Sequence, residues 1–457
     1  MKLRYRRIIY LTFIGFFLIA VPTVSFYAAG YSYNFKRHKI EKTGILYIDS
    51  KPKDALIYIN DQYEAKTPKR FARLLPDIYK IRVEKNGYYS WEKELEVKSN
   101  LTTFSKDIIL FKKNLPINII EGEISILASS KNQEKIIYSL TKENIDELRL
   151  LNLRSNEDIL IKQFNNQAYN QLEFMEWSPS QNKALLKEVI GEFAKYLIVD
   201  IETLKVREIF DITRLNFNKV SWDTLDDNYL YALRKAVFYQ IDLFNNSTKI
   251  LLSANIEDFQ VNKNEAYYIT RVANELFLNK IILNGENIEL AEKIKLPSPS
   301  QYSLQPSTPE YLVLLDKKNN DLFIINSKSF DDENIEDNIV LQDRAKKIIW
   351  SKDLTSLLYY TDFEIWTFNF STRQKNLITR YGETIDQAFW HTGEKYIVYR
   401  TGNIIKTIED NPSEIKNDLQ LAELSRVSSL TIDDQGKNLY FIGQAGNKEG
   451  IYKLEIQ

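Results

Sequence analysis

Hydrophobic and polar side chains alternate with a period of two in short runs that begin at about residue 43. This period is typical of half-buried β-strands. Lys93 interrupts one run, which places that end of the strand near the rim of the core, and Asn86-Gly87 precedes the run with the residues of a tight hairpin turn. The pattern predicts a small β-domain over residues 43–112. Its expected inward positions are Tyr79, Ile81, Val83, Trp91, Leu95 and Val97.

From residue 116 to 457 the strand pattern repeats. A strand that ends in Trp, a short turn and a second apolar strand recur at 174–186, 347–360 and 387–399. The repeat interval is about 43 residues, within the ~40–45 expected of four-stranded β-propeller blades. A small sheet buries its faces only against neighbours like itself, so the repeat predicts a β-propeller. The repeats begin near Ile124, Glu173, Lys219, Ile256, Gln301, Ala345, Ile385 and Arg426.

The sixth repeat is the clearest, with strands expected at 347–350, 356–360, 364–370 and 376–379. The eighth repeat lacks a fourth strand, because the chain stops after 450–456. Residues 116–120 form an apolar segment before the first repeat and have no partner there. We therefore predict that they complete the last blade, which removes the exposed edges of an open array. Seven blades are the alternative to eight, but they require longer repeats and leave this segment unexplained.

A long apolar run precedes the β-domains, since residues 8–35 carry no charged side chain. About 20 apolar residues cross a bilayer as a helix. We therefore expect a cytoplasmic tail (1–7), a transmembrane anchor (8–29) and a linker (30–42). The alternative is a cleaved signal peptide, because Ala28 and Gly30 are small residues where a signal peptidase reads; the run is, however, longer than the usual signal core of about 7–15 residues.

Basic residues flank the apolar run on both sides, so the positive-inside rule gives nearly equal counts. The tail before the run is very short and also carries the free amino group, which favours a cytoplasmic N-terminus. We expect a single-pass membrane protein of the cell envelope, with the bulk of the chain extracytoplasmic. The flanking residues are Lys2, Arg4, Arg6 and Arg7 before the run and Lys36, Arg37, Lys39 and Lys42 after it.

Within the small β-domain, the segments 44–55, 57–61, 67–68, 75–83 and 86–88 resemble the PEGA domain family. The chain departs from the family at 52–55, which reads Pro-Lys-Asp-Ala, and at Asp77, where a glycine usually stands. Both departures fall in turns that Asp can occupy. The resemblance implies an extracytoplasmic β-sandwich without catalytic residues. Trp91, Tyr79 and Tyr88 could form a glycan-stacking face, but inward aromatic residues favour a place in the core.

The Trp-Ser turns at 177–180 and 350–353 resemble those of TolB-like and WD-repeat propellers. The turns at 222–224 and 390–393 are weaker copies. The resemblance implies a propeller and suggests protein or peptide binding, without fixing a partner. The tryptophans themselves are expected to pack between blades rather than bind a ligand.

Composition narrows the classes of function. The 61 basic and 62 acidic residues nearly cancel, so the chain has no net positive charge that would favour binding to nucleic acid. The chain has no Cys, which excludes disulfides, thiol nucleophiles, iron–sulfur clusters and Cys-ligated zinc. Its only histidines are His38 and His391, which excludes a three-histidine metal centre. We expect no metal and no cofactor.

No catalytic motif is present: the chain has no Gly-x-Ser-x-Gly elbow, no phosphate-binding Gly-rich loop and no calcium loop. His391 stands where other repeats have Ser178 and Ser351, so we interpret it as a turn residue rather than a general base. The acidic runs 331–333 and 433–434 are interpreted as solvated loops. A carboxylate pair of the glycosidase type needs no motif, so that possibility stays open.

These observations predict an all-β, non-enzymatic protein with a membrane helix, a PEGA-like sandwich and a propeller. Its function is expected to be a binding or scaffold platform for an envelope protein or cell-wall glycan, with no nucleic acid. The alternative is a propeller hydrolase acting on envelope glycan or peptide, which would require carboxylates of shifted pKa converging at the mouth of the propeller channel. A sensor is a third hypothesis, but the short cytoplasmic tail offers no effector. No catalytic, cofactor or metal residue is assigned, and the oligomeric state stays open.

Overall fold

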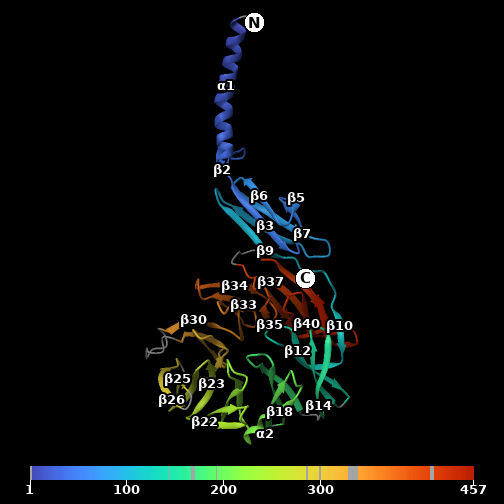
Figure 1. Cartoon of the computed structure of the whole chain (residues 1–457), viewed down its shortest axis with the longest axis vertical. Coiled ribbons are helices and arrows are strands. Elements are labelled where there is room, and N and C mark those ends of the chain that lie inside the picture. The colour runs from blue at the N-terminus through green and yellow to red at the C-terminus, as the bar shows by residue number, and fades with distance from the viewer. Residues whose placement is uncertain are drawn as a thin grey trace. The chain divides into compact units, whose positions relative to one another are not determined.

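The computed structural model describes residues 3–143, 145–165, 170–191, 193–284, 287–297, 300–327, 338–411 and 416–457 (Figure 1). The chain divides into two compact units. The first holds residues 1–115, 413–421 and 455–457, and the second holds residues 116–412 and 422–454. After the first helix in the sequence, strands predominate in both units, which confirms the all-β fold class.

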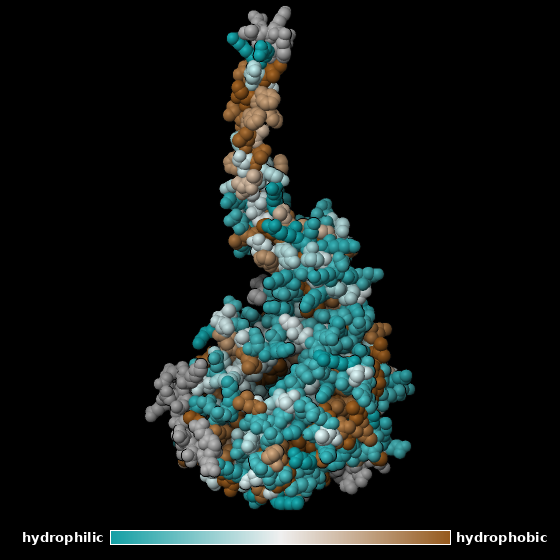
Figure 2. Space-filling view, in the orientation of Figure 1, coloured by the Kyte–Doolittle hydropathy of each residue, from teal (hydrophilic) through white to brown (hydrophobic). Residues whose placement is uncertain are grey.

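Helix α1 (Leu3–Ala28) opens the chain. Its segment Arg6–Ala28 has a mean hydropathy of 2.2 and none of it is buried, so it is long and apolar enough to cross a membrane. Hydrophobic side chains cover much of its length (Figure 2). Its threonines stay paired within the helix: Thr12 Oγ1 donates to the Ile8 carbonyl at 2.9 Å and Thr23 Oγ1 to the Ile19 carbonyl at 2.7 Å. Such pairing lowers the cost of a hydroxyl in an apolar environment.

The segment expected to be a linker contains a hairpin of β1 (Tyr31–Asn34) and β2 (Lys39–Lys42). The small domain after it consists of two sheets. One sheet has the order β6 (Lys69–Leu74), β3 (Gly44–Lys51), β9 (Thr102–Ile109). The other has the order β5 (Gln62–Lys66), β4 (Leu56–Ile59), β7 (Asp77–Glu84), β8 (Trp91–Val97).

The predicted inward positions of β7 and β8 form part of the core of this domain. Ile81, Val83, Trp91 and Val97 are buried, while the half-buried Tyr79, Tyr88 and Leu95 pack against them. The aromatic residues are therefore core residues rather than an exposed stacking face. Lys93 is buried as well, which contradicts the predicted position near the rim.

The outward side of the β7–β8 hairpin carries charge pairs. Lys80 Nζ lies 4.0 Å from Glu92 and Arg82 Nε lies 3.9 Å from the same carboxylate. Gly87 has a φ of 82°, as a tight turn at Asn86-Gly87 requires. The connection is longer than a two-residue hairpin, because it runs over residues 85–90.

Within the described residues, the strands between residues 117 and 455 form eight four-stranded sheets, which we number as blades 1 to 8. Figure 1 shows them side by side around a common centre. The first strands of several neighbouring blades contact one another, so these strands are innermost. Blades 1 to 4 comprise β11 (Glu123–Ser129), β12 (Lys135–Lys142), β13 (Ile145–Asn152), β14 (Glu157–Asn165); β15 (Asn170–Trp177), β16 (Lys183–Ile190), β17 (Phe193–Asp200), β18 (Val206–Glu208); β19 (Lys219–Trp222), β20 (Tyr229–Arg234), β21 (Val237–Asp242), β22 (Ser247–Ser253); and β23 (Ile256–Asn262), β24 (Glu265–Val272), β25 (Glu275–Asn284), β26 (Asn287–Lys295).

The remaining blades follow the same order, and the sixth has its strands close to the predicted positions. They comprise β27 (Tyr302–Gln305), β28 (Tyr311–Asp316), β29 (Asp321–Asn326), β30 (Ile339–Arg344); β31 (Lys347–Trp350), β32 (Ser356–Tyr360), β33 (Glu364–Asn369), β34 (Gln374–Arg380); β35 (Ile385–Trp390), β36 (Tyr396–Thr401), β37 (Ile404–Glu409), β38 (Asp418–Glu423); and β39 (Arg426–Ile432), β40 (Asn438–Ala445), β41 (Lys448–Glu455), β10 (Ile117–Glu121).

The predicted closing strand is confirmed. β10 pairs antiparallel with β41 as the outer strand of blade 8, so the two ends of the repeat region meet in one sheet. Gly450 makes this approach possible, since a Cβ there would lie 1.9 Å from the Ile120 carbonyl oxygen. The Gly122 amide extends the pairing with a 2.9 Å hydrogen bond to the Glu449 carbonyl.

One short helix interrupts the predicted strand pattern. α2 (Ile209–Thr213) lies in the connection from blade 2 to blade 3. Ile209 is buried among the residues that blades 2 and 3 share, so the helix covers the end of that interface.

Candidate binding face of the propeller

Each blade has a turn between its first and second strands, which we name the first turn. The third turn, between the third and fourth strands, lies at the same end of the sheet because neighbouring strands are antiparallel. Together these turns form one end of the ring, the turn face. The first turns are residues 130–134, 178–182, 223–228, 263–264, 306–310, 351–355, 391–395 and 433–437.

Hydrogen bonds join each first turn, or the last residue of the strand before it, to that of the next blade. The donor is a backbone amide in four of these links and a side chain in the other four, so different residue types make the same connection. Around the ring they are Asn132 N to Gln181 Oε1 (2.8 Å), Ser178 Oγ to Asp227 Oδ2 (2.9 Å), Lys263 N to Thr224 Oγ1 (2.8 Å), Asn262 Nδ2 to Thr308 O (2.6 Å), Trp350 Nε1 to Pro306 O (2.8 Å), Lys352 N to the Glu394 carboxylate, His391 Nε2 to Gly436 O (3.0 Å), and Asp434 N to Gln133 O (3.2 Å).

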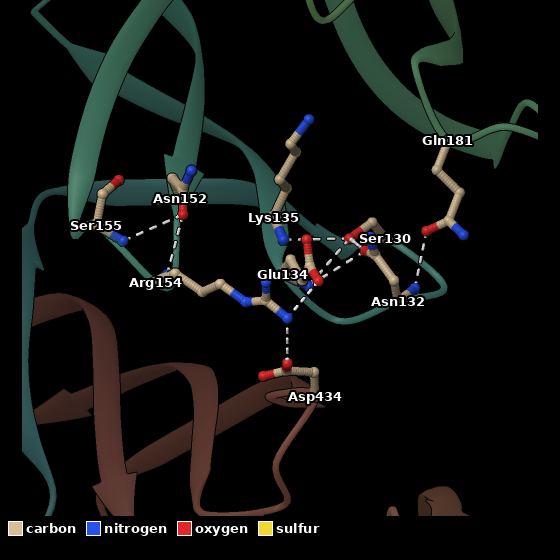
Figure 3. A network of polar contacts seen from close by, with 9 residues as sticks. All are labelled: Ser130, Asn132, Glu134, Lys135, Asn152, Arg154, Ser155, Gln181 and Asp434. Atoms are coloured by element: carbon tan, nitrogen blue, oxygen red, sulfur yellow. Dashed lines mark hydrogen bonds and ion pairs between the residues drawn. The ribbon is translucent and has the colours of Figure 1, made fainter.

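The link between blades 8 and 1 carries an additional ion pair (Figure 3). Arg154, in the third turn of blade 1, places Nη2 2.5 Å from Glu134 and 2.8 Å from Asp434. The Asn152 side chain holds this turn by accepting hydrogen bonds from the Arg154 and Ser155 amides, at 2.9 and 3.2 Å. Arg154 thus links blade 1 to blade 8 on the turn face.

The acidic run at 433–434 is structural rather than solvated, which corrects the interpretation from sequence. Asp433 is buried and accepts hydrogen bonds from the Lys437 amide at 2.7 Å and the Asn438 side chain at 2.6 Å. Asp434 pairs with Arg154. The other acidic run, 331–333, lies outside the described residues.

The four tryptophans of the Trp turns pack between blades, as the sequence predicts. Each one belongs to an apolar cluster built from its own blade and a neighbouring blade. Three of the indoles also donate to a carbonyl of the preceding blade: Trp177 to Ser129 at 2.7 Å, Trp350 to Pro306 at 2.8 Å and Trp390 to Ile349 at 3.3 Å. Trp222 differs, because its buried Nε1 has no hydrogen-bond partner among the described residues.

His391 is the predicted turn residue. Its amide donates to the Tyr396 carbonyl at 2.8 Å, as Ser178 does to Lys183 and Ser351 does to Ser356. The residue is 2% exposed, and in its ring Nε2 donates to the Gly436 carbonyl while Nδ1 accepts from the Gly393 amide at 3.4 Å. A ring held on both nitrogens by backbone groups is a structural link rather than a general base.

Carboxylates on the first strands are engaged by basic side chains. Glu173 lies 3.5 Å from Lys187, Asp258 lies 2.6 Å from Lys219, and Asp386 lies 2.9 Å from Arg400. These ion pairs hold the three carboxylates against neighbouring strands of the propeller.

Glu176 is the one first-strand carboxyl whose pKa is shifted upward among the described residues, and burial is the main cause. Its Oε1 accepts a 2.5 Å hydrogen bond from the Trp222 amide in the next blade. Asp258 and Gln387 do the same for the amides of Leu304 and Leu430, at 2.8 and 2.9 Å. Because the uncharged Gln387 serves equally, Glu176 is a blade-to-blade link rather than a catalytic acid.

The turn face contains a pocket of about 440 Å³, within the range of ligand sites. It is bounded by first turns of blades 4, 5 and 6 and by the third turn of blade 6. Its lining residues are Lys263, Thr308, Pro309, Glu310, Tyr311, Asp353, Leu354, Thr355, Phe370 and Ser371. They come from segments more than 100 residues apart in the chain, and the sequence analysis named none of them as a site.

Repeating Asp or Asn residues at the ends of third strands are a signal that the sequence analysis missed. Asn152, Asp200, Asp242 and Asn369 each accept hydrogen bonds from amides two or three residues later. These Asx turns set the shape of the turn face. The following apolar residue points inward, and in blade 6 it is Phe370, which lines the pocket. The described residues contain no group of three or more His, Cys, Asp and Glu side chains that could hold a metal ion.

Comparison with known proteins supports the two β-regions separately. The PEGA domain family matches residues 43–112. The C-terminal WD40 domain of Sif2 has a TM-score of 0.51 at 11% identity, over 75% of this chain and 98% of that one. Dihydro-heme d1 dehydrogenase NirN gives 0.48 at 11% identity (76% and 78% covered), and an oligogalacturonate lyase in complex with manganese gives 0.43 at 11% (74% and 99%). No curated protein matches the chain. The first region is therefore a PEGA domain, and the likeness to solved structures shows a β-propeller fold.

Proposed function

We propose that this protein is a membrane-anchored, extracytoplasmic binding platform. Residues 8–29 would anchor the chain after a cytoplasmic tail of residues 1–7. Residues 43–112 would be a spacer, and the propeller of residues 116–457 would present its turn face to a partner protein of the cell envelope. The proposal assigns no chemistry to the propeller.

The observation that carries the proposal is the turn face itself. Its first turns are fixed by a circle of blade-to-blade hydrogen bonds, and this rigid frame surrounds a pocket with an apolar floor and a polar rim. A preformed surface loses little conformational entropy when it binds, which favours recognition. The hydrolase alternative has less support, because Glu173, Asp258 and Asp386 are ion-paired and Glu176 serves as a blade link.

The anchor can be tested with single cysteines, because the natural chain has none. Ser247→Cys places one on an exposed strand of blade 3. We expect a membrane-impermeant maleimide to label it in intact cells, and the protein to stay with membranes after carbonate extraction. Protection from the reagent would contradict the orientation. A mature chain that begins after Gly30 would show that the helix is a cleaved signal.

The platform can be tested by photo-crosslinking in intact envelopes. Ser371 lies on the turn face, in the third turn of blade 6. Asn447 lies in blade 8, at the opposite end of the ring. Both positions are exposed, so each can carry a photoreactive residue. We expect a discrete adduct with an envelope protein from position 371 and none from 447. Adducts from 447 alone, or from neither position, would contradict the proposal.

A further inference from the structure

We propose that the pocket of blades 4 to 6 recognises a cationic side chain, arginine or lysine, on an exposed segment of the partner protein. This inference rests on the proposed function, since it names the chemistry by which the turn face binds a protein. The pocket combines an aromatic floor with an oriented carboxylate, and a long cationic side chain matches both.

The floor of the pocket is a stack of aromatic rings. The centroid of the Phe370 ring lies 4.3 Å from that of Tyr311 and 5.1 Å from that of Trp350, with interplanar angles of 30° and 25°. Phe370 is buried and Tyr311 is half-buried, so the pocket lies over a rigid apolar base. At its edge Leu354 is 47% exposed. The methylene stem of an arginine or lysine can pack on such a surface while its charged end stays near the rim.

Asp353 stands at the rim with its carboxylate held in place. Oδ1 accepts hydrogen bonds from Ser351 Oγ at 2.7 Å, the Thr355 amide at 3.0 Å and Thr355 Oγ1 at 2.9 Å. Among the described residues, Oδ2 accepts only from Thr355 Oγ1, at 2.9 Å. The hydrogen bonds from Ser351 and Thr355 also hold the pKa of Asp353 below its usual range. Oδ2 is therefore an oriented, ionised acceptor on the pocket wall.

The charge of the lining favours a cation over an anion. Asp353 and Glu310 contribute two negative charges and Lys263 one positive charge. The backbone amide of Lys263 fixes the turn through Thr224, and the two carboxylates leave the lining with a net negative charge. A guanidinium or ammonium group can donate a charge-assisted hydrogen bond to Asp353. A neutral apolar side chain can only pack against the aromatic floor.

The test uses the full chain in detergent micelles and four small probes: acetyl-arginine amide, acetyl-lysine amide, acetyl-norleucine amide and N-acetylglucosamine. Titration followed by saturation-transfer NMR gives the affinity of each. We expect the two cationic probes to bind, and Asp353→Asn to weaken them about tenfold, as the loss of one charge-assisted hydrogen bond implies. Asn can still accept from Ser351 and Thr355, so the turn is preserved, and thermal melting checks the fold.

Asp226→Asn is the matched control, because Asp226 accepts a turn amide at 2.8 Å in the first turn of blade 3 and lies outside the pocket lining. It should leave cation binding unchanged. Norleucine amide binding as well as arginine amide, N-acetylglucosamine binding alone, or a well-folded Asp353→Asn variant with unchanged affinity would each overturn the inference.

The crosslinking experiment separates this inference from the platform itself. If the adduct from position 371 persists in the Asp353→Asn variant, the platform stands and the cation site is overturned. If position 371 gives no adduct while the cationic probes still bind, the pocket stands and the proposed protein partner does not.

Discussion

The PEGA domain and the propeller are both all-β, yet their strands are buried in different ways. In the PEGA domain, buried residues of β3 alternate with half-buried ones until the strand ends at the exposed Lys51. In the propeller, the second strands β12, β24 and β40 each have five consecutive buried residues. A sheet in a two-layer sandwich has one face on the core, whereas a blade has a neighbour on both faces. The comparison shows that the pattern of apolar residues along a strand depends on whether one or both faces of its sheet are covered.

Adjacent residues of β32 make the contrast specific. Leu357 and Leu358 are both fully buried, but Leu357 packs with blade 5 and Leu358 with blade 7. In β7 of the PEGA domain, Ile81 is fully buried while the neighbouring Lys80 is exposed. Truncation therefore has different consequences in the two regions.

The largest expected effects come from truncating these pairs. Leu357→Ala and Leu358→Ala should each lower the free energy of unfolding by about 2–5 kcal/mol, and so should Ile81→Ala, because each leaves a cavity. Lys80→Ala should cost less than about 1 kcal/mol, since its ion pairs are exposed. Chemical denaturation of the four variants measures the difference. A harmless substitution at either Leu357 or Leu358 would contradict the two-faced burial of the blade.

The next effect concerns the closing strand of the ring. Gly450→Ala would force a Cβ against the Ile120 carbonyl, so we expect a loss of about 1–3 kcal/mol and faster hydrogen exchange in blade 8. Gly382→Ala is the control, because no atom lies within 4 Å of the added Cβ. Equal melting temperatures for the two variants would show that β10 does not hold the ring.

The blade interfaces themselves differ in how they use tryptophan. Trp177→Phe removes a buried hydrogen bond to Ser129, whereas Trp222→Phe removes an indole N–H that has no partner among the described residues. We expect Trp177→Phe to be about 1 kcal/mol more destabilising than Trp222→Phe. Thermal denaturation followed by circular dichroism compares them, and the reverse order would contradict this account of the interfaces.

The smallest expected effect depends on pH. Burial raises the pKa of Glu176 in the folded protein, so the folded state holds its proton more tightly than the unfolded state does. Stability should therefore fall as pH rises from the unfolded pKa of about 4.3 through the folded value. Glu176→Gln should melt above the natural protein at pH 8 and match it more closely at pH 4.5. A wider gap at pH 4.5 than at pH 8 would refute the assigned direction.

The sequence predicts the strands better than the surface between them. The strands of the sixth repeat and the role of residues 116–120 follow from a local pattern and from a missing fourth strand. The buried Lys93 and the helix α2 are not predictable in this way, because tertiary packing overrides the local pattern. The pocket is a still clearer case: Lys263 and Phe370 belong to different repeats and meet only in the assembled ring.

Closure of blade 8 also has a consequence for the order of synthesis. A ribosome makes β10 before every other strand of the propeller and β41 after all of them, since they span residues 117–121 and 448–455. The outermost strand of that sheet therefore stays unpaired with β41 until residues 448–455 have been translated. The ring is completed only after β41 has been made, and any product truncated before β41 keeps an open edge.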